Sequence, residues 1–359
     1  MERADRIARL RLIRSATIGP VTYRQLLARF GSAEAALAAI PDLAARGGGR
    51  PPRLVSQAEA ESEAEKVVRL GAEYLFLGEE DYPALLAEAE AAAPVLIVKG
   101  EVGLLTRQAV AIVGARNASA AACRFARGLA QALGEAGLLV VSGLARGIDS
   151  AAHDGALETG TAGVIAGGID IVYPPENEER QRAVAERGLL IAEMPPGTEP
   201  RARHFPWRNR IIAGLATGTV VIEAAPKSGS LITARLAADY GREVMAVPGS
   251  PLDPRAQGCN LLIREGATLI QTAEDVLEAI RPGAIPKQPP SPVRDPAPVP
   301  DAGDAERDTL AGLLGPTPVP VDELIRQSGL APALVPTILL ELELAGRLER
   351  HAGGKVSLA

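Results

Sequence analysis

Apolar and polar positions follow a regular rhythm between residues 107 and 280. Short apolar runs end in small or turn-forming residues, and a segment with helical spacing separates each run from the next. The runs are QAVAIVGAR, LLVVSG, TAGVIAGG, GLLIAEMP, GTVVIEAAP and EVMAVPGS. Continuous apolar strands that alternate with helices are typical of a parallel sheet covered on both faces. The pattern therefore predicts an α/β fold with an extended Rossmann-like parallel-sheet core over residues 107–280.

The first 53 residues show a helical rather than a strand-like period. Helical spacing in IARLRLIRS is followed by the turn Ile18-Gly19-Pro20, a second helix up to Gly31, and a third that starts at Ser32 and ends before Pro41. Two helices joined by such a turn predict a SAM-like or helix–hairpin–helix-like module, which often binds phosphate; a plain packing module is the alternative. Residues 54–106 are expected to connect this module to the core, with strand-like YLFLG and VLIVKG on the way.

The C-terminal part begins with a change in composition. Eight prolines lie between Pro282 and Pro300, so residues 281–303 are expected to form an extended linker. Three helix candidates and a hairpin follow in residues 304–359, which predicts an independently folded winged-helix-like module. Its third helix, VPTILLELELAG, contains Glu341 and Glu343 and no basic residue. Because groove-reading helices need donors to DNA, this helix favours protein contact or packing.

Composition and charge narrow the class of protein. The chain has 38 basic and 44 acidic residues and a net charge of −6, yet the first 53 residues hold ten arginines against four acidic residues. Such local segregation keeps a polyanionic partner open. Two cysteines are too few for a disulfide framework or a four-thiolate zinc site. No apolar stretch is long enough to span a membrane and no secretion signal is evident, so we expect a cytoplasmic location.

Candidate chemistry collects in loops that follow the predicted strands, where open α/β sheets bind ligands. In the first of these loops, Gly114 lets the backbone approach a ligand, Arg116 can form bidentate bonds with phosphate, and Ser119 is placed to cap a helix. An ordinary tight turn is the alternative for Gly114. The second strand ends in Ser142 and Gly143 and leads to Arg146.

Two further segments add to this set. The loop after GTVVIEAAP supplies a cation, two hydroxyls and a helix start, all suited to phosphate, although such a loop also suits a capped turn. The run 201–210 combines four arginines with aromatic residues and no acid, as single-stranded nucleic acid requires. Buried aromatics with internal ion pairs are the alternative here. The candidates are Lys227, Ser228, Gly229 and Ser230 in the loop, and Phe205, Trp207, Arg208, Asn209 and Arg210 in the run.

Several enzyme classes lack their motifs. The first loop is not GxGxxG, the second strand does not end in an acid that would hold a ribose, and there is no Walker A pattern. The three histidines are scattered, so we expect no metal site, no cofactor and no catalytic residue set. Glu223 at a strand end is either catalytic or, as we prefer, a brace for its loop.

Taken together, these strings resemble the DprA (Smf) family of DNA-processing proteins. The resemblance rests on VGARNAS, SGLARGIDSAAH, AGGIDIVYPPEN, FPWRNRIIAGL, VIEAAPKSGSLITA and AVPGSPLD, which span roughly 107–272. It implies a Rossmann-like core that binds single-stranded DNA without cleaving it, a homodimer, and delivery of DNA to the RecA recombinase during natural transformation. It also implies DNA-pocket roles for Gly114, Arg116 and Lys227. In YPPEN, Pro175 and Glu176 stand where some relatives carry a basic residue, so no phosphate contact is expected there.

The leading hypothesis is therefore a non-enzymatic protein that binds and protects single-stranded DNA and promotes RecA loading. Arg116 and Lys227 would neutralise phosphates, and Phe205 or Trp207 would stack on bases beside Arg208 and Arg210. One rival is a Rossmann-type nucleotide-processing enzyme, similar to a phosphoribohydrolase, that acts near Glu223, Asp149 and Ser230. Another is a scaffold whose winged helix binds proteins.

Overall fold

The computed structural model describes residues 2–281, 301–351 and 353–359. These residues form two compact units. One unit contains the helices up to residue 62 together with the C-terminal part from residue 301, and the other comprises residues 63–281. The proline-rich linker prediction falls mainly on residues 282–300, which lie outside the described residues.

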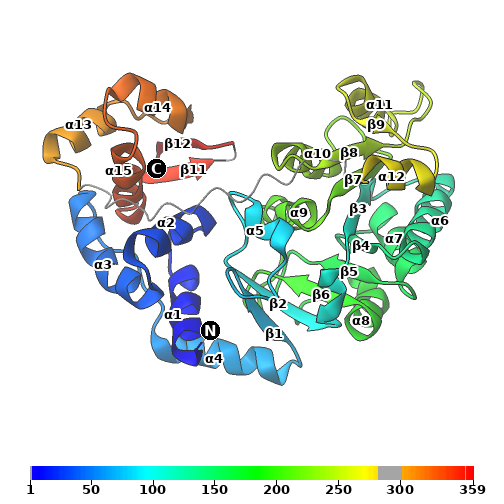
Figure 1. Ribbon diagram of the computed structural model, residues 1–359, viewed down its shortest axis with the longest axis horizontal. Helices are drawn as coiled ribbons and strands as arrows, with labels where there is room; N and C mark the ends of the chain where they lie inside the picture. Colours follow the sequence, from blue (N-terminus) through cyan, green and yellow to red (C-terminus); the bar gives the residue numbers. More distant parts are fainter. Residues whose placement is uncertain (1, 282–300, 352) are drawn as a thin grey trace. The chain divides into compact units, whose positions relative to one another are not determined.

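A nine-stranded sheet forms the centre of residues 63–281 (Figure 1). Seven neighbouring strands, from β6 (Leu189–Ala192) across the sheet to β9 (Thr268–Leu269), run parallel. The strands β1 (Glu73–Phe76) and β2 (Val95–Gly100) are antiparallel additions at one edge. This arrangement confirms the predicted Rossmann-like α/β core. The order across the sheet is β1 (Glu73–Phe76), β2 (Val95–Gly100), β6 (Leu189–Ala192), β5 (Thr161–Val164), β4 (Leu139–Ser142), β3 (Ala109–Gly114), β7 (Gly218–Ile222), β8 (Glu243–Ala246) and β9 (Thr268–Leu269).

Helices cover both faces of this sheet because successive strand residues point to opposite sides. Val110 and Ile112 pack with α6, α7 and α12, whereas Ala111 and Val113 belong to the core beneath α5, α9 and α10. This double coverage explains why the strands are apolar throughout. The helices are α5 (Ala84–Glu88), η1 (Val102–Thr106), α6 (Ala120–Glu135), α7 (Ile148–Ala156), η2 (Pro175–Asn177), α8 (Glu178–Arg187), α9 (His204–Leu215), α10 (Ser230–Asp239), α11 (Gln257–Arg264) and α12 (Ala273–Ala279).

The first residues fold into three helices, as the helical period predicts. They are α1 (Arg3–Arg14), α2 (Pro20–Phe30) and α3 (Ala33–Arg46), and α4 (Gln57–Arg69) follows them. Ser32 caps α3 by accepting a hydrogen bond from Ala35 N at 3.2 Å. The prediction that this helix ends before Pro41 is wrong, because Pro41 lies inside α3. Ile40, Leu43 and Ala44 are buried on either side of it, and their packing offsets the backbone hydrogen bond that proline cannot donate.

The C-terminal residues form the winged helix that the sequence predicts. A small sheet in the order β10 (Val319–Pro320), β12 (Lys355–Leu358), β11 (Leu348–His351) accompanies α13 (Asp304–Gly312), α14 (Val321–Ser328) and α15 (Leu334–Leu344). Its core is made by Leu310, Leu324, Ile338 and Leu342, among others.

This winged helix does not stand apart from the N-terminal helices. Leu340 and Leu344 of α15 are buried in the same cluster as Leu37, Ile40 and Leu43 of α3. The expectation of an isolated C-terminal module therefore needs correction, because α15 has a second apolar face that α3 covers.

The two acids of α15 also differ from expectation. Glu341 is fully buried and bonds with Arg307, and Glu343 is buried and bonds with Arg350. Their charge is neutralised inside this unit and is not displayed on a surface. We still expect α15 not to read DNA, because it lacks basic donors and its two acids are buried.

Candidate nucleic-acid interface

The loops that follow β3, β4, β5, β6 and β7 lie at one edge of the sheet because these strands are parallel. The chain leaves β3 toward α6 on one face and leaves β7 toward α10 on the other. Between such diverging loops an open α/β sheet has its usual ligand crevice. The side chains at this edge decide what the crevice can hold.

A carboxylate of the protein occupies the phosphate position of this crevice. The side chain of Glu223 accepts hydrogen bonds from Ser119 N at 2.8 Å and from Ser119 Oγ at 2.6 Å, at the start of α6. Ser119 Oγ in turn accepts from Ala122 N at 3.1 Å and caps the helix. A helix N-terminus attracts an anion, and here the anion is internal. This geometry fits Glu223 as a brace and leaves Ser119 no free donor for DNA.

Gly114 is required by packing. A Cβ at this position would lie 1.9 Å from the carbonyl oxygen of Ile222 and 2.6 Å from a side-chain carbon of Ile148. The glycine thus allows β3 and β7 to end close together and aims the next residues outward. Arg116, two residues later, is exposed.

Three side chains from different loops meet beside this crevice. The guanidinium carbon of Arg116 lies 5.1 Å from the ring centre of Phe205, which is at the start of α9. The ring of Tyr173, from the segment after β5, lies 5.6 Å from the Phe205 ring on a tilted plane. Cation–π and tilted aromatic contacts of this kind hold flat surfaces in fixed orientation. Sequence reasoning did not single out Tyr173, although its position in the YPPEN segment was a signal.

A buried arginine lies behind these rings. Arg208 packs on Gly143, where an added Cβ would come within 1.5 Å of Arg208 Nη1, so the glycine makes room for the guanidinium. Burial lowers the pKa of Arg208 to about 10, with nearby Asp149 opposing and Arg116 adding to the shift. Burial also raises the pKa of Asp149, against the effect of Arg208 and a hydrogen bond from Ala145 N. Arg208 Nε is buried without a hydrogen-bond partner.

A second, smaller space lies in front of Arg208 and is too small for a base. It has a volume of about 10 Å³ and is lined by Gly143, Tyr173, Phe205 and Arg208, together with the apolar turn after β5. A space of this size holds about one water molecule.

Four expected site residues turn inward. Ser142 is fully buried and donates to Ile112 O at 2.6 Å, and Asn209 Nδ2 donates to Gly229 O at 3.3 Å. Arg210 is buried and bonds with Glu193 and with Ala91 O. Ser230 is also buried, and its hydroxyl shares a hydrogen bond with Ser228 at 2.7 Å. We therefore narrow the expected contact set to the exposed residues.

Exposed cations and a further exposed aromatic ring belong to the loops and the helix at this same edge of the sheet. Arg116, Arg146 and Lys227 are exposed on three of the loops, and Gly229 is exposed beside Lys227. Trp207 exposes 52% of its surface and its ring lies 6.2 Å from that of His204. Burial, followed by the charges of Arg203 and Arg201, lowers the pKa of His204 below its ordinary value.

The described residues lack two kinds of feature, a cluster of metal ligands and a membrane-spanning helix. Within residues 2–281, 301–351 and 353–359, no group of three or more His, Cys, Asp or Glu side chains is arranged to hold a metal ion. In the same residues, none of the helices combines the length and apolar character needed to cross a bilayer.

Comparison with known proteins agrees with this architecture. Residues 73–281 match the family model for DNA recombination-mediator protein A, residues 3–65 a DprA-like N-terminal HHH domain, and residues 294–354 a DprA winged helix domain. The DNA processing protein DprA of Streptococcus pneumoniae is 46% identical over 198 residues, 55% of this chain and 70% of that protein.

Among the solved structures that are similar to this chain, two are of DNA processing protein A. The X-ray structure of DprA from Streptococcus pneumoniae has a TM-score of 0.60 and 39% identity, over 64% of this chain and 80% of that one. DNA processing protein A from Helicobacter pylori, whose structure is described as giving insight into its single-stranded DNA binding mode, has a TM-score of 0.53 and 28% identity, over 57% and 94%.

Fold and site thus define a modular α/β protein of the DNA-processing class, which has a helical module and a winged helix in addition to its sheet. The chain belongs to the DNA recombination-mediator protein A family, the DprA/Smf proteins.

Proposed function

We propose that this protein binds single-stranded DNA without cleaving it, protects incoming strands during natural transformation and promotes their loading with RecA. The observation that carries the proposal is the meeting of Arg116 with Phe205 and Tyr173 beside exposed Arg146 and Lys227. Flat rings can stack on bases of any identity, and arginines pair with phosphates. The solved structure of the Helicobacter pylori relative, described by its single-stranded DNA binding mode, supports the same ligand.

The choice of a single strand over a nucleotide follows from Glu223. Its carboxylate already accepts both donors of Ser119, so a nucleotide phosphate at the start of α6 would meet negative charge. The rings and cations outside the crevice suit a polymer that lies along the edge. The rival nucleotide-processing enzyme would need the position that Glu223 fills.

Two partners belong to the proposal as well: a second copy of this chain and the RecA recombinase. β9 ends the sheet, and Leu269 on this edge strand exposes 46% of its surface. An open strand edge with an apolar side chain is suited to pairing with another chain. Light scattering of the wild type and of Leu269→Lys tests the homodimer. RecA filament formation on DNA coated with single-strand-binding protein tests loading.

The contact surface is tested with Arg116→Ala. We expect weaker binding to labelled oligothymidylate and to mixed-sequence strands alike, because a phosphate contact carries no base identity. The dependence of affinity on salt should fall by about 0.7 in log–log slope, which corresponds to one phosphate contact on a single strand.

Arg69→Ala is the matched control for this experiment. Arg69 ends α4 just before β1, at the opposite edge of the sheet, and its side chain is 66% exposed. Removing it changes the net charge equally and should leave the slope unchanged. Equal slopes for both variants would remove Arg116 from the interface. Steady nucleotide turnover that disappears in Glu223→Gln would instead favour the enzyme rival.

A further inference from the structure

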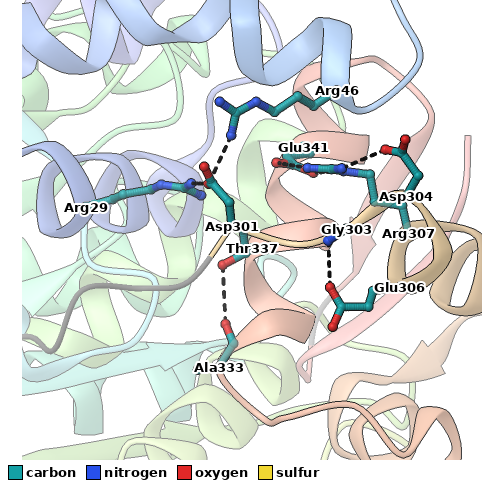
Figure 2. Close-up of polar contacts among 10 residues, drawn as sticks. All are labelled: Arg29, Arg46, Asp301, Gly303, Asp304, Glu306, Arg307, Ala333, Thr337 and Glu341. Carbon is teal, nitrogen blue, oxygen red and sulfur yellow. Dashed lines mark hydrogen bonds and ion pairs between the residues drawn. The ribbon is translucent and has the colours of Figure 1, made fainter.

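One carboxylate of the winged helix binds two arginines of the N-terminal helices. Asp301 Oδ1 lies 2.5 Å from Arg29 Nη2 and 2.9 Å from Arg46 Nη1 (Figure 2). Arg29 is in the last turn of α2 and Arg46 ends α3. A single oxygen between two guanidinium groups is the contact that a phosphate oxygen makes with an arginine pair. Arg29 Nη1 is also buried without a hydrogen-bond partner.

The winged helix holds Asp301 in this position. Gly303 N donates to Glu306 at 2.6 Å, which ties the segment bearing Asp301 to the start of α13. Arg307 of α13 bonds with buried Glu341 at 2.8 Å and so ties α13 to α15 (Figure 2). Movement of the winged helix away from α3 would therefore carry Asp301 with it.

The winged helix also packs directly against the residues that follow α3, through contacts that do not involve Asp301. A Cβ at Gly47 would lie 2.1 Å from Glu341 O, and one at Gly49 would lie 2.2 Å from Ala345 O. The glycines after α3 thus let the end of α15 approach the backbone. Arg347 Nη1 also donates to Gly47 O at 3.1 Å.

We propose that Arg29 and Arg46 form a phosphate-binding site for single-stranded DNA, which Asp301 occupies while the winged helix is seated on α3. DNA and Asp301 compete for the same guanidinium groups, so the winged helix limits DNA binding by the N-terminal helices. The Asp301 side chain is 59% exposed, and solvent screens such a contact, so a polyanion can replace it. The proposal rests on the proposed binding of single-stranded DNA.

Asp301→Asn tests the competition directly. We expect affinity for labelled oligothymidylate to rise about fivefold, the low end of coupling between linked sites. Asp322→Asn is the control, because Asp322 is an exposed acid in the same winged helix, in the first turn of α14. In a chain that also carries Arg29→Ala and Arg46→Ala, the gain from Asp301→Asn should vanish. A gain that persists there, or that Asp322→Asn reproduces, overturns the proposal.

Gly47→Ala should release the winged helix, and Asp301 with it, from the N-terminal helices without changing any charge. Its methyl group removes the space that α15 needs, so amide hydrogen exchange in residues 334–344 should speed up and DNA affinity should rise. Gly312→Ala is the control, since a Cβ there meets nothing within 4 Å. Faster exchange in α15 without a gain in affinity overturns the proposal.

Arg116→Ala separates this inference from the proposed function. If the proposed interface on the α/β unit fails, Arg116→Ala changes nothing while Asp301→Asn still raises affinity. If the present inference fails, Arg116→Ala weakens binding and Asp301→Asn has no effect. A gain in Asp301→Asn that is confined to duplex DNA also overturns the assignment to single strands.

Discussion

Arg208 and Arg210 are two residues apart on α9 and serve different purposes. Arg210 pairs with Glu193 and holds Ala91 O, so it ties α9 to the neighbouring loops. Arg208 rests on Gly143 close to Asp149, directly behind the rings of the interface. With a pKa lowered only to about 10, Arg208 stays charged at neutral pH. A buried positive charge behind the rings adds attraction for a polyanion without touching it.

The fluorescence of Trp207 is a probe of DNA binding at the proposed interface. Trp207 is the only tryptophan in the chain and half of it is exposed, two residues from Phe205. We expect its fluorescence to change when oligothymidylate binds, and Arg116→Ala to shift this change to higher DNA concentration. Trp207→Phe removes the signal and serves as the blank. Saturated binding, measured by anisotropy of labelled DNA, with unchanged emission would place Trp207 outside the DNA footprint.

His153 is a buried residue that the interface does not use. Thr161 Oγ1 donates to Val140 O at 3.0 Å, so it accepts from His153 Nδ1 at 2.7 Å, which assigns the proton to Nδ1. Nε2 is buried and has no partner. Burial, with a smaller effect from Arg180, lowers the pKa of His153 to about 3. The folded protein therefore keeps this ring neutral.

A loss of stability in mild acid follows from His153. The unfolded chain takes up this proton near pH 6.5 and the folded chain only near pH 3, so the free energy of unfolding falls as pH drops through that interval. The limiting slope is about 1.4 kcal/mol per pH unit. Urea unfolding at a series of pH values, with His153→Asn as the non-titrating control, measures it. A charged His153 imidazole in the NMR spectrum of the folded protein near pH 5 would contradict this expectation.

At the residue scale, the sequence identified exposed Arg116 and Lys227 from their loops, because loop position alone determines exposure there. It did not separate Arg208 and Arg210 from their exposed neighbours. Their partners are Asp149 at the start of α7 and Glu193 just after β6. These acids are distant in the sequence, and local spacing carries no information about such contacts. Whether a charged residue is exposed or buried depended on these distant acids.

At the scale of elements, the β3–loop–α6 unit determines how the site is presented. Gly114 lets β3 end against Ile222, Ser119 caps α6, and Glu223, the residue after β7, accepts two hydrogen bonds from Ser119. Arg116 is thus displayed by a loop that is anchored on each side. In the proposed interface, such anchoring would reduce the entropy lost on phosphate binding.

Gly114→Ala should disturb this unit and the sheet beside it. The new methyl group would lie 1.9 Å from Ile222 O, and neither backbone has room to move. Overpacking of this kind costs about 1–3 kcal/mol. Gly103→Ala is the matched control, because a Cβ at Gly103 meets nothing within 4 Å. Equal unfolding midpoints for the two variants in urea would show that the β3–β7 contact yields more easily than we infer.

Strands and helices of the sheet domain were predictable because each shows its own period along the chain. The extension of α3 through Pro41 was not, because only burial of Ile40 and Leu43 compensates for the lost hydrogen bond. The seating of α15 on α3 was not predictable either. Its apolar residues on all sides indicate burial, but the partner lies about 300 positions earlier in the chain.

At the scale of the whole molecule, the division of the chain into units differs from its order in the sequence. The helices at the start and the winged helix at the end share one core, while residues 63–281 have their own. Removing the C-terminal residues therefore exposes the apolar side of α3, although it leaves the sheet intact.

Truncation distinguishes the two units. A fragment of residues 56–281 keeps α4 with its starting Ser56, and should unfold cooperatively and bind oligothymidylate within a few-fold of the full chain. A fragment of residues 1–281 should show fast hydrogen exchange in α3, whose partner α15 is missing. A hundredfold loss of affinity in the 56–281 fragment, about 2.7 kcal/mol, would mean that the other unit supplies essential contacts.

The carboxylate of Glu223 at the start of α6 has a consequence for how free nucleotides would compete with single-stranded DNA for this protein. Inside a cell, free nucleotides vastly outnumber single-stranded DNA, and they carry the same phosphates and bases. A protein with an open nucleotide pocket would be filled by them. In the proposed function, Glu223 takes up the donors of Ser119 that a free nucleotide could otherwise use, whereas a long strand would reach several contacts at once. Chain length then becomes the property that is selected.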